Sequence, residues 1–312
     1  MDVIIQTLVV SLVDISTQIS SLSLPNPTML ASGIMDEDAG SMKRILESGA
    51  GAVVTKSIGK TARKGHANPT FVELECGILN AMGLPNPGID EYINELKELT
   101  KENGIIIGSV FGSDISEFTE VASKMSPYVH ALELNFSCPH AKGYGLEIGQ
   151  NPTFVSDITS SVVKSVSIPV FVKLSAQVND IAAIGKAAEQ SGASAIVAIN
   201  TLKAMSINLD VKKPILGNKT GGYSGKAIKP IGVRSVYELY HNLKIPIIGV
   251  GGIESGLDAI EFLMAGASSI QIGTGVYTHG ITVFEDITNE ITNWMKDHSI
   301  QTIPELIGVA HQ

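Results

Sequence analysis

Cys138 is the side chain of this sequence that is best suited to chemistry. It lies in ELNFSCPHAKGYG (133–145), after an apolar run and directly before Pro139, which would stop pairing within a sheet. A thiol with a pKa of about 8.5 can accept a proton near neutral pH when cationic groups or backbone dipoles favour the thiolate. Of nearby residues only His140 could assist it, so a protease-like nucleophile has little support. The alternative is a cysteine that only fills space.

Two lysines and three asparagines could surround a ligand. Lys56 (TKS) and Lys173 (VKL) interrupt apolar segments. A buried lysine needs an anionic partner, such as a phosphate, a carboxylate or the electron-rich edge of a cofactor; otherwise each would point to solvent. Asn80, Asn135 and Asn200 lie near the ends of such segments, where asparagine most often forms turns. Converging at one place, they would suit a planar, amide-rich ligand, because each offers a donor and an acceptor.

Three glycine-rich segments could hold a phosphate. They are GGYSG (221–225), GVGGI (249–253) and IGTG (272–275). Glycines at such positions let backbone N–H groups face phosphate oxygens, and a following helix adds partial positive charge. Each segment alone is weak evidence, since glycine is common at turns. The last two favour a phosphate site because they end the last two predicted strands.

Eight short runs rich in Val and Ile must position these groups. They are PTMLASG (27–33), AVVTKSI (52–58), GIIIGSV (104–110), ALELNFS (131–137), PVFVKLS (169–175), SAIVAIN (194–200), IPIIGVG (245–251) and SSIQIGT (268–274). Runs that are apolar on both faces are typical of a parallel sheet covered by helices. Helical segments separate them, one starting at an Asn cap (179) and ending at Gly192, another starting at Ser255 and ending at Gly266.

We therefore predict an α/β fold, a single (β/α)8 TIM barrel that spans residues 1–312 as one domain. An open doubly wound sheet is the alternative. The alternating residues before Pro25 predict an N-terminal β-hairpin that closes the barrel floor. Residues 57–89, 137–151 and 201–230 are long connections after strands two, four and six. In a barrel these loops would be neighbours at the C-terminal face, where active sites lie.

The composition excludes several classes of protein. A net charge of −9 without clustered Lys and Arg disfavours nucleic acid as a partner. No apolar run approaches the roughly 20 residues that span a bilayer, and no basic segment marks a secretory signal. Cys76 and Cys138 have no zinc or disulfide spacing, so we expect no metal site, a reducing cytoplasmic setting, and Cys76 as a small buried residue.

Taken in order, these motifs resemble the dihydroorotate dehydrogenases, in particular the catalytic subunits of class 1B. The matching segments are ASG (31–33), TKSI (55–58), NAMGLPNPG (80–88), ELNFSCP (133–139), VKL (172–174), INT (199–201), GGYSGKAIKP (221–230), GVGGI (249–253) and IGTG (272–275). NAMGLPNPG and the Asn-x-Ser-Cys-Pro loop are the specific part of this signature. The resemblance covers nearly the whole chain.

The resemblance implies an FMN enzyme that oxidises (S)-dihydroorotate to orotate in pyrimidine (UMP) biosynthesis. Cys138 would take the proton from C5 while hydride passes from C6 to flavin N5. Lys173 would stabilise negative charge at the N1 and C2 side of reduced flavin. The implied substrate-binding residues are Lys56, Asn80, Ala81, Met82, Gly83, Leu84, Asn135, Asn200 and Thr201. The implied FMN-binding residues are Ser32, Lys56, Ser57, Ser109, Asn135, Lys173, Ile199, Gly225, Gly251, Gly252, Gly273 and Thr274, of which the last four would hold the phosphate.

Class 1B further implies a homodimer of this chain within a heterotetramer. Its partner subunit would carry FAD and a 2Fe-2S cluster and pass electrons to NAD, in keeping with the lack of a cysteine quartet here. Three positions depart from the family pattern: His140 replaces an Asn that contacts substrate, Lys226 replaces a Pro, and Ser109 replaces an Asn near the flavin. Residues 140–145 would form a mobile lid.

Other functions stay open from the residues alone. A dihydropyrimidine dehydrogenase-like flavin oxidoreductase would share the loop cysteine but reduce uracil, which lacks the carboxylate that Lys56 would bind. A flavin-free barrel that binds a sugar phosphate, either an aldolase or an isomerase, would use the glycine segments alone. A noncatalytic scaffold would not need polar residues gathered at one face.

Overall fold

The eight Val- and Ile-rich runs form one closed parallel barrel. The computed structural model describes residues 13–136 and 149–312. Around the barrel the strands are β3 (Thr28–Leu30), β4 (Ala52–Val54), β7 (Ile105–Val110), β8 (Ala131–Asn135), β9 (Val170–Leu174), β10 (Ala195–Ala198), β15 (Ile247–Val250) and β16 (Ala267–Ile272), which pairs with β3. Because every neighbouring pair is parallel, all carboxyl ends face one end of the barrel. The prediction of a TIM barrel is confirmed.

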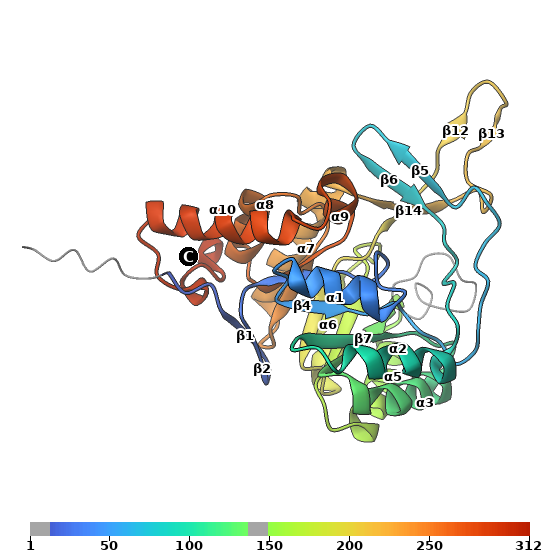
Figure 1. Cartoon of the computed structure of the whole chain (residues 1–312), viewed down its shortest axis with the longest axis horizontal. Coiled ribbons are helices and arrows are strands. Elements are labelled where there is room, and N and C mark those ends of the chain that lie inside the picture. The colour runs from blue at the N-terminus through green and yellow to red at the C-terminus, as the bar shows by residue number, and fades with distance from the viewer. Residues whose placement is uncertain (1–12, 137–148) are drawn as a thin grey trace, which may run out of the picture.

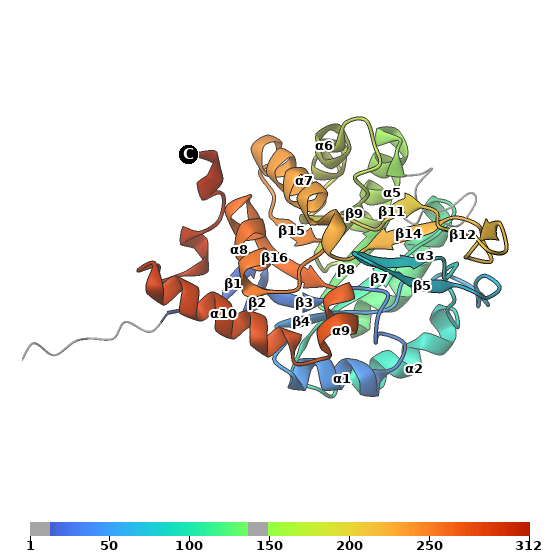
Figure 2. The ribbon, with the colours of Figure 1, turned by 90° about the horizontal axis from the view of Figure 1, so that it is seen from above.

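Helices surround this barrel (Figures 1 and 2). They are α1 (Ala39–Glu47), α2 (Ile89–Leu99), α3 (Ile115–Met125), α5 (Pro152–Ser165), α6 (Ile181–Gln190), α7 (Lys229–Asn242), α8 (Gly256–Met264), α9 (Thr274–His279) and α10 (Val283–Asp297), with short 3-10 turns η1 (Ser126–Tyr128), η2 (Lys226–Ile228), η3 (Ile303–Glu305) and η4 (Val309–His311). Helix α8 is capped by Ser255 as predicted, but α6 is capped by Asp180 and not by Asn179. The Asp180 carboxylate accepts a hydrogen bond from the Ala183 amide, which satisfies a free N–H of the first turn.

Alternating side chains on each strand divide the core into two layers. On β8, Leu132 and Leu134 pack outward against the helices, whereas Ala131 packs in the barrel interior. The N-terminal hairpin of β1 (Thr17–Ile19) and β2 (Leu22–Leu24) buries Ile19 and Leu24 in the same interior cluster. The predicted hairpin therefore closes the barrel floor with apolar side chains.

Strand β4 is shorter than the run AVVTKSI (52–58) that predicted it. The strand ends at Val54, and Lys56 lies beyond it. The Lys56 amide donates to the Asp36 carbonyl 3.3 Å away, so the backbone leaves the barrel ladder at this point. Lys56 therefore lies in an irregular segment just past the strand end, while Lys173 lies within β9 as predicted.

Two of the long connections build a second sheet at one end of the barrel (Figure 1). Strands β5 (Phe71–Leu74) and β6 (Gly77–Asn80) come from the loop after β4, and β11 (Leu202–Ala204) and β14 (Gly221–Ser224) come from the loop after β10. They pair in the order β11-β14-β6-β5. The prediction that these loops are neighbours is confirmed for this pair.

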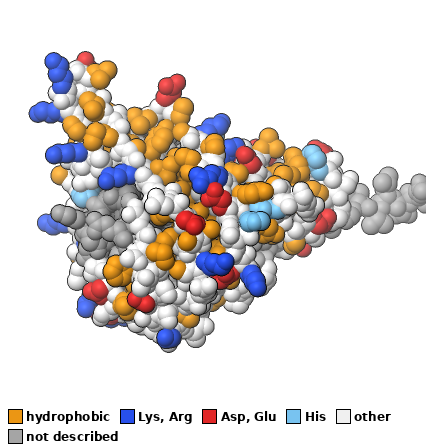
Figure 3. Space-filling model, turned by 180° about the vertical axis from the view of Figure 1, so that it is seen from behind, with side chains coloured by type: hydrophobic (Ala, Val, Ile, Leu, Met, Phe, Trp, Pro, Cys, Tyr) orange, Lys and Arg blue, Asp and Glu red, His pale blue; other side chains and the backbone are white. Residues whose placement is uncertain are grey.

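A further hairpin projects from this sheet. It consists of β12 (Ile207–Asn208) and β13 (Lys213–Pro214) and exposes Ile207, Leu209 and Val211. Apolar and lysine side chains lie together on this projecting corner (Figure 3). Among the helices that the structure describes, none is long and apolar enough to cross a membrane.

Candidate active site

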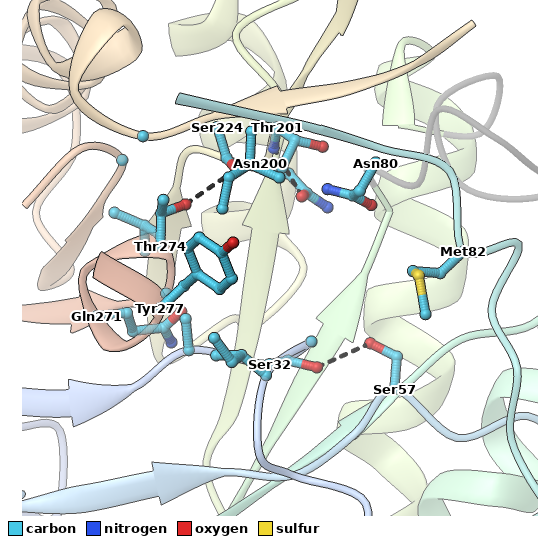
Figure 4. A pocket seen from close by; sticks show the side chains of 18 of the residues that line it. Ser32, Ser57, Asn80, Met82, Asn200, Thr201, Ser224, Gln271, Thr274 and Tyr277 are labelled. Atoms are coloured by element: carbon cyan, nitrogen blue, oxygen red, sulfur yellow. Dashed lines mark hydrogen bonds between the residues drawn. The ribbon is translucent and has the colours of Figure 1, made fainter. Parts of the chain in front are cut away.

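A cavity of about 460 Å³ opens at the carboxyl ends of the barrel strands, a size typical of ligand pockets. Figure 4 shows side chains from the barrel and from the second sheet around it. The predicted site residues in its wall are Ser32, Lys56, Ser57, Asn80, Met82, Gly83, Leu84, Asn135, Lys173, Ile199, Asn200, Thr201, Gly225, Gly251, Gly252, Gly273 and Thr274. The structure therefore brings together residues that are spread over most of the sequence.

Lys173, Glu133 and Gln271 form a closed set of contacts at the base of the cavity, which we call the floor network; Lys173 and Gln271 line the cavity. The side chains of Lys173 and Glu133 are only 5% and 0% exposed. Lys173 Nζ lies 3.2 Å from Glu133 Oε1 and donates to Gln271 Oε1 at 3.1 Å. Gln271 Nε2 donates to Glu133 Oε2 at 2.6 Å. The lysine charge is thus balanced by a buried carboxylate and fixed in direction by a bridging amide.

Hydroxyl and amide groups link the two sides of the cavity. Ser57 Oγ lies 3.2 Å from Ser32 Oγ and 2.8 Å from Ser109 Oγ, and it accepts from Asn135 Nδ2 at 3.0 Å. Asn200 Nδ2 in turn lies 3.5 Å from Asn135 Oδ1. Figure 4 shows the Ser32–Ser57 bond at the base of the view. Ser109 is fully buried behind Ser57 and does not line the cavity, so it acts on the cavity only by orienting the Ser57 hydroxyl.

The loop that follows β6 is held in shape by Asn86. Its buried side chain donates to the Leu84 carbonyl at 2.9 Å and accepts from the Gly88 amide at 2.9 Å. Gly83 has φ of 79°, and a Cβ there would lie 2.6 Å from the His66 ring, so only glycine fits. Met82, Gly83 and Leu84 face the cavity, whereas Ala81 is buried behind them in a small apolar cluster.

Lys56 reaches the mouth of the cavity and pairs with Glu37. Its Nζ lies 2.9 Å from Glu37 Oε1, and both residues line the cavity. The lysine side chain is 14% exposed and the glutamate 69%. This ion pair therefore lies against solvent, in contrast to the floor network.

Asp36 supports Lys56 from below. Its carboxylate accepts from the Gly33 amide, and its carbonyl accepts from Tyr92 Oη at 2.7 Å as well as from the Lys56 amide. Burial raises the pKa of the Asp36 carboxyl group, and the nearby Lys56 ammonium opposes this shift. The segment from Gly33 to Asp36 is thus tied to the residue that presents the Lys56 side chain.

Glycines from three segments form one wall, which we call the glycine cradle: Gly225, Gly251, Gly252 and Gly273, with Thr274. Gly252 has φ of 72°, and a Cβ there would lie 2.7 Å from the Gly225 carbonyl oxygen. Thr274 Oγ1 donates to Ser224 Oγ at 2.9 Å (Figure 4). Backbone close approach, amide donors and hydroxyls are the donor set that suits a phosphate. The wall thus fits the phosphate of FMN, and Lys173 fits the electron-rich edge of its ring.

Several residues in the cavity wall or behind it were not identified from the sequence. Gln271, in the wall, and the buried Glu133 behind it are polar residues in apolar strands, the same signal that identified Lys173. Phe71 of β5 and Tyr277 of α9 meet at the mouth, with ring centroids 5.3 Å apart. No sequence pattern marked this pair, because its members come together only through the second sheet. The expectation that Cys76 is buried is wrong, since it lies exposed in the turn between β5 and β6.

Cys138, His140 and the predicted lid of residues 140–145 lie outside the described residues. Their roles therefore stay predictions. Within residues 13–136 and 149–312, no group of three or more His, Cys, Asp or Glu side chains is placed to hold a metal ion.

Comparison with known proteins gives one consistent result. The family model described as dihydroorotate dehydrogenase matches residues 14–295. Relatives named "dihydroorotate dehydrogenase B (NAD(+)), catalytic subunit" share high identity with the chain. The protein of Methanocaldococcus jannaschii is 53% identical over 96% of this chain and 98% of its own length. That of Pyrococcus horikoshii is 49% identical over 95% and 97%, and that of Thermoplasma acidophilum is 48% identical over 95% and 99%.

Proposed function

The chain belongs to the dihydroorotate dehydrogenase family, and from this premise we propose that it oxidises (S)-dihydroorotate to orotate in pyrimidine (UMP) biosynthesis. The observation that carries the proposal is a single cavity lined by Lys56, by the loop Met82–Leu84 and by the asparagines 80, 135 and 200. A carboxylate and a cyclic diamide need a cation together with paired donors and acceptors. A neutral dihydropyrimidine would use the asparagines but would leave Lys56 without a ligand.

The substrate would lie between the 80–86 loop and the asparagines. Lys56 and the backbone around Gly83 would bind the carboxylate, because an ammonium group and amide donors suit a delocalised anion. Asn80, Asn135, Asn200 and Thr201 would bind the ring amides. Asn135 is already oriented by its bond to Ser57, so the ring would meet a pre-aligned amide.

FMN would fit with its phosphate against the glycine cradle and its ring above the floor network, and it would supply the hydride acceptor for this oxidation. Lys173 would stabilise the negative charge that a reduced ring carries at its N1 and C2 side. Because Glu133 and Gln271 hold Lys173 in place, this positive charge need not reorganise during the reaction. Cys138 would remove the C5 proton as general base.

We further propose that electrons leave this chain for NAD through a separate subunit carrying FAD and a 2Fe-2S cluster. The names of the relatives, which include "NAD(+)" and "catalytic subunit", support NAD as the acceptor and the existence of a further subunit. The FAD and the cluster are what the resemblance to class 1B implies. A homodimer of this chain within a heterotetramer, and a cytoplasmic location, accompany this proposal as expectations.

Anaerobic titration tests the proposed substrate directly. The purified protein should be yellow, and dihydroorotate should bleach its flavin absorbance while dihydrouracil does not. A colourless protein would instead favour the flavin-free barrel. If the protein turns over uracil or dihydrouracil but not dihydroorotate, it is a dihydropyrimidine enzyme. NAD and fumarate, each with and without the partner subunit, would then identify the electron acceptor.

Replacing Cys138 tests the base. Cys138→Ala should retain FMN but reduce flavin bleaching at neutral pH on the order of 10²-fold, the typical effect of losing a general base. Cys76→Ala is the matched control, because Cys76 lies exposed in a hairpin turn outside the cavity wall. Wild-type bleaching rates in Cys138→Ala would exclude the base role.

A further inference from the structure

We propose that Glu37 competes with the substrate carboxylate for Lys56 and thereby sets the affinity of the site for anionic ligands. This inference rests on the proposed function, in which Lys56 binds the carboxylate of dihydroorotate or orotate. Glu37 already holds Lys56 Nζ at 2.9 Å, and both side chains line the cavity. A ligand carboxylate and the Glu37 carboxylate would therefore claim the same ammonium group.

The two partners differ in how freely each can move. Lys56 is held at its base, where its amide donates to the Asp36 carbonyl, and its side chain is mostly covered. Glu37 is 69% exposed and directly precedes Asp38, the residue that caps helix α1. Exposed ion pairs are weak because water solvates the separated charges well. When the two separate, Glu37 is the partner that can turn into solvent, and Lys56 stays in the wall.

The charges around the cavity explain why Glu37 must leave. Lys173 is balanced by Glu133, and Lys56 is balanced by Glu37, so the two pairs together contribute no net charge. Asp36 adds a further carboxyl group near Lys56. A bound carboxylate next to an unmoved Glu37 would place two anions on one ammonium group, with strong repulsion at contact distance. Displacement of Glu37 removes this repulsion at the cost of one weak ion pair.

The competition predicts a selective gain of affinity in Glu37→Gln. We expect the dissociation constant of orotate to fall about fivefold, roughly the contribution of an exposed ion pair. Uracil, which has the ring amides but no carboxylate, should bind within twofold of the wild type. Glu47→Gln is the matched control: it removes the same charge from an exposed site on helix α1, outside the cavity wall.

The experiment measures dissociation constants for orotate and uracil by flavin absorbance in the FMN-loaded protein. It compares the wild type with Glu37→Gln, Glu47→Gln, Lys56→Met and the double variant Lys56→Met/Glu37→Gln. Because competition requires Lys56, the fivefold gain should shrink below twofold when Lys56 is absent. An equal gain in that background would mean general repulsion and would overturn the inference.

Two other outcomes would also overturn it. In the first, Glu37→Gln leaves the affinity for orotate unchanged or lowers it. In the second, Glu37→Gln raises the affinities for orotate and uracil equally, as a change in the shape of the cavity would. Failure of the proposed function looks different, because the wild type itself would then bind no orotate.

Discussion

The floor and the mouth of one cavity each hold a lysine–glutamate pair, and the two pairs differ in burial and in the contacts that hold them. At the floor, Lys173 and Glu133 are buried and cross-linked by Gln271. At the mouth, Lys56 meets an exposed Glu37. The difference teaches that residue type alone does not define a role. A buried pair is a fixed charge distribution, whereas an exposed pair can exchange its anion.

Replacing Lys173 of the floor network should produce the largest effect, because it tests whether the buried pair depends on its cation. Lys173→Met leaves the buried Glu133 carboxylate without a cation, which should lower the free energy of unfolding by about 3–5 kcal/mol. Lys173→Met/Glu133→Leu should recover most of this loss, because no buried charge remains. Urea unfolding at one fixed FMN concentration measures the free energy of unfolding of both variants. The two variants lack the same lysine, so any loss of FMN binding cancels between them. Equal free energies of unfolding for the two variants would show that burying the Glu133 carboxylate without a cation costs little stability.

Removing the mouth lysine should affect binding and leave stability nearly unchanged. Lys56→Met should weaken orotate binding about 10- to 100-fold, the loss expected for a charge-assisted hydrogen bond. The free energy of unfolding should change by less than about 1 kcal/mol, because Glu37, the partner in this pair, is exposed. Absorbance titration and urea unfolding provide the two values. A loss of stability as large as that of Lys173→Met would remove the distinction between the two lysines.

The smallest effect is expected at Asp36, below the mouth lysine. Its pKa is raised from 3.8, so above that pH the folded chain binds more protons than the unfolded chain. The free energy of unfolding therefore falls as pH rises through this window. Asp36→Asn cannot ionise and should be more stable on the order of 1 kcal/mol at pH 8, a typical single-substitution effect. This advantage should vanish below about pH 4, as thermal unfolding at several pH values would reveal. A pH-independent difference would contradict the assignment.

The sequence predicted the barrel because each strand carries its own signal. Runs such as AVVTKSI and PVFVKLS are apolar on both faces, so local chemistry was sufficient. The second sheet gave no such signal. FVEL (71–74) alternates weakly, and β6 pairs with a strand some 140 positions away, as Gly222 and Asn80 do. Such pairings depend on loop geometry that no short segment encodes.

Residues of the cavity could be predicted from the sequence where a polar residue interrupts an apolar strand. Lys173 in an apolar strand stood out, and Glu133 and Gln271 satisfy the same criterion. Glu37 could not be recognised, because DED (36–38) is typical of a helix start. The three acidic residues directly follow Met35, whose φ of 50° is a left-handed conformation that a non-glycine residue does not signal in the sequence.

The pairing of β6 with β14 makes two binding regions parts of one sheet. Asn80 pairs with Gly222, and Ile78 pairs with Ser224, which adjoins Gly225 of the glycine cradle. A shift of either strand therefore moves the other. If FMN and orotate bind as proposed, this coupling would be reciprocal: orotate would raise the affinity for FMN by the same factor by which FMN raises the affinity for orotate. Retention of the proposed prosthetic group and capture of the next substrate would then depend on the same linkage.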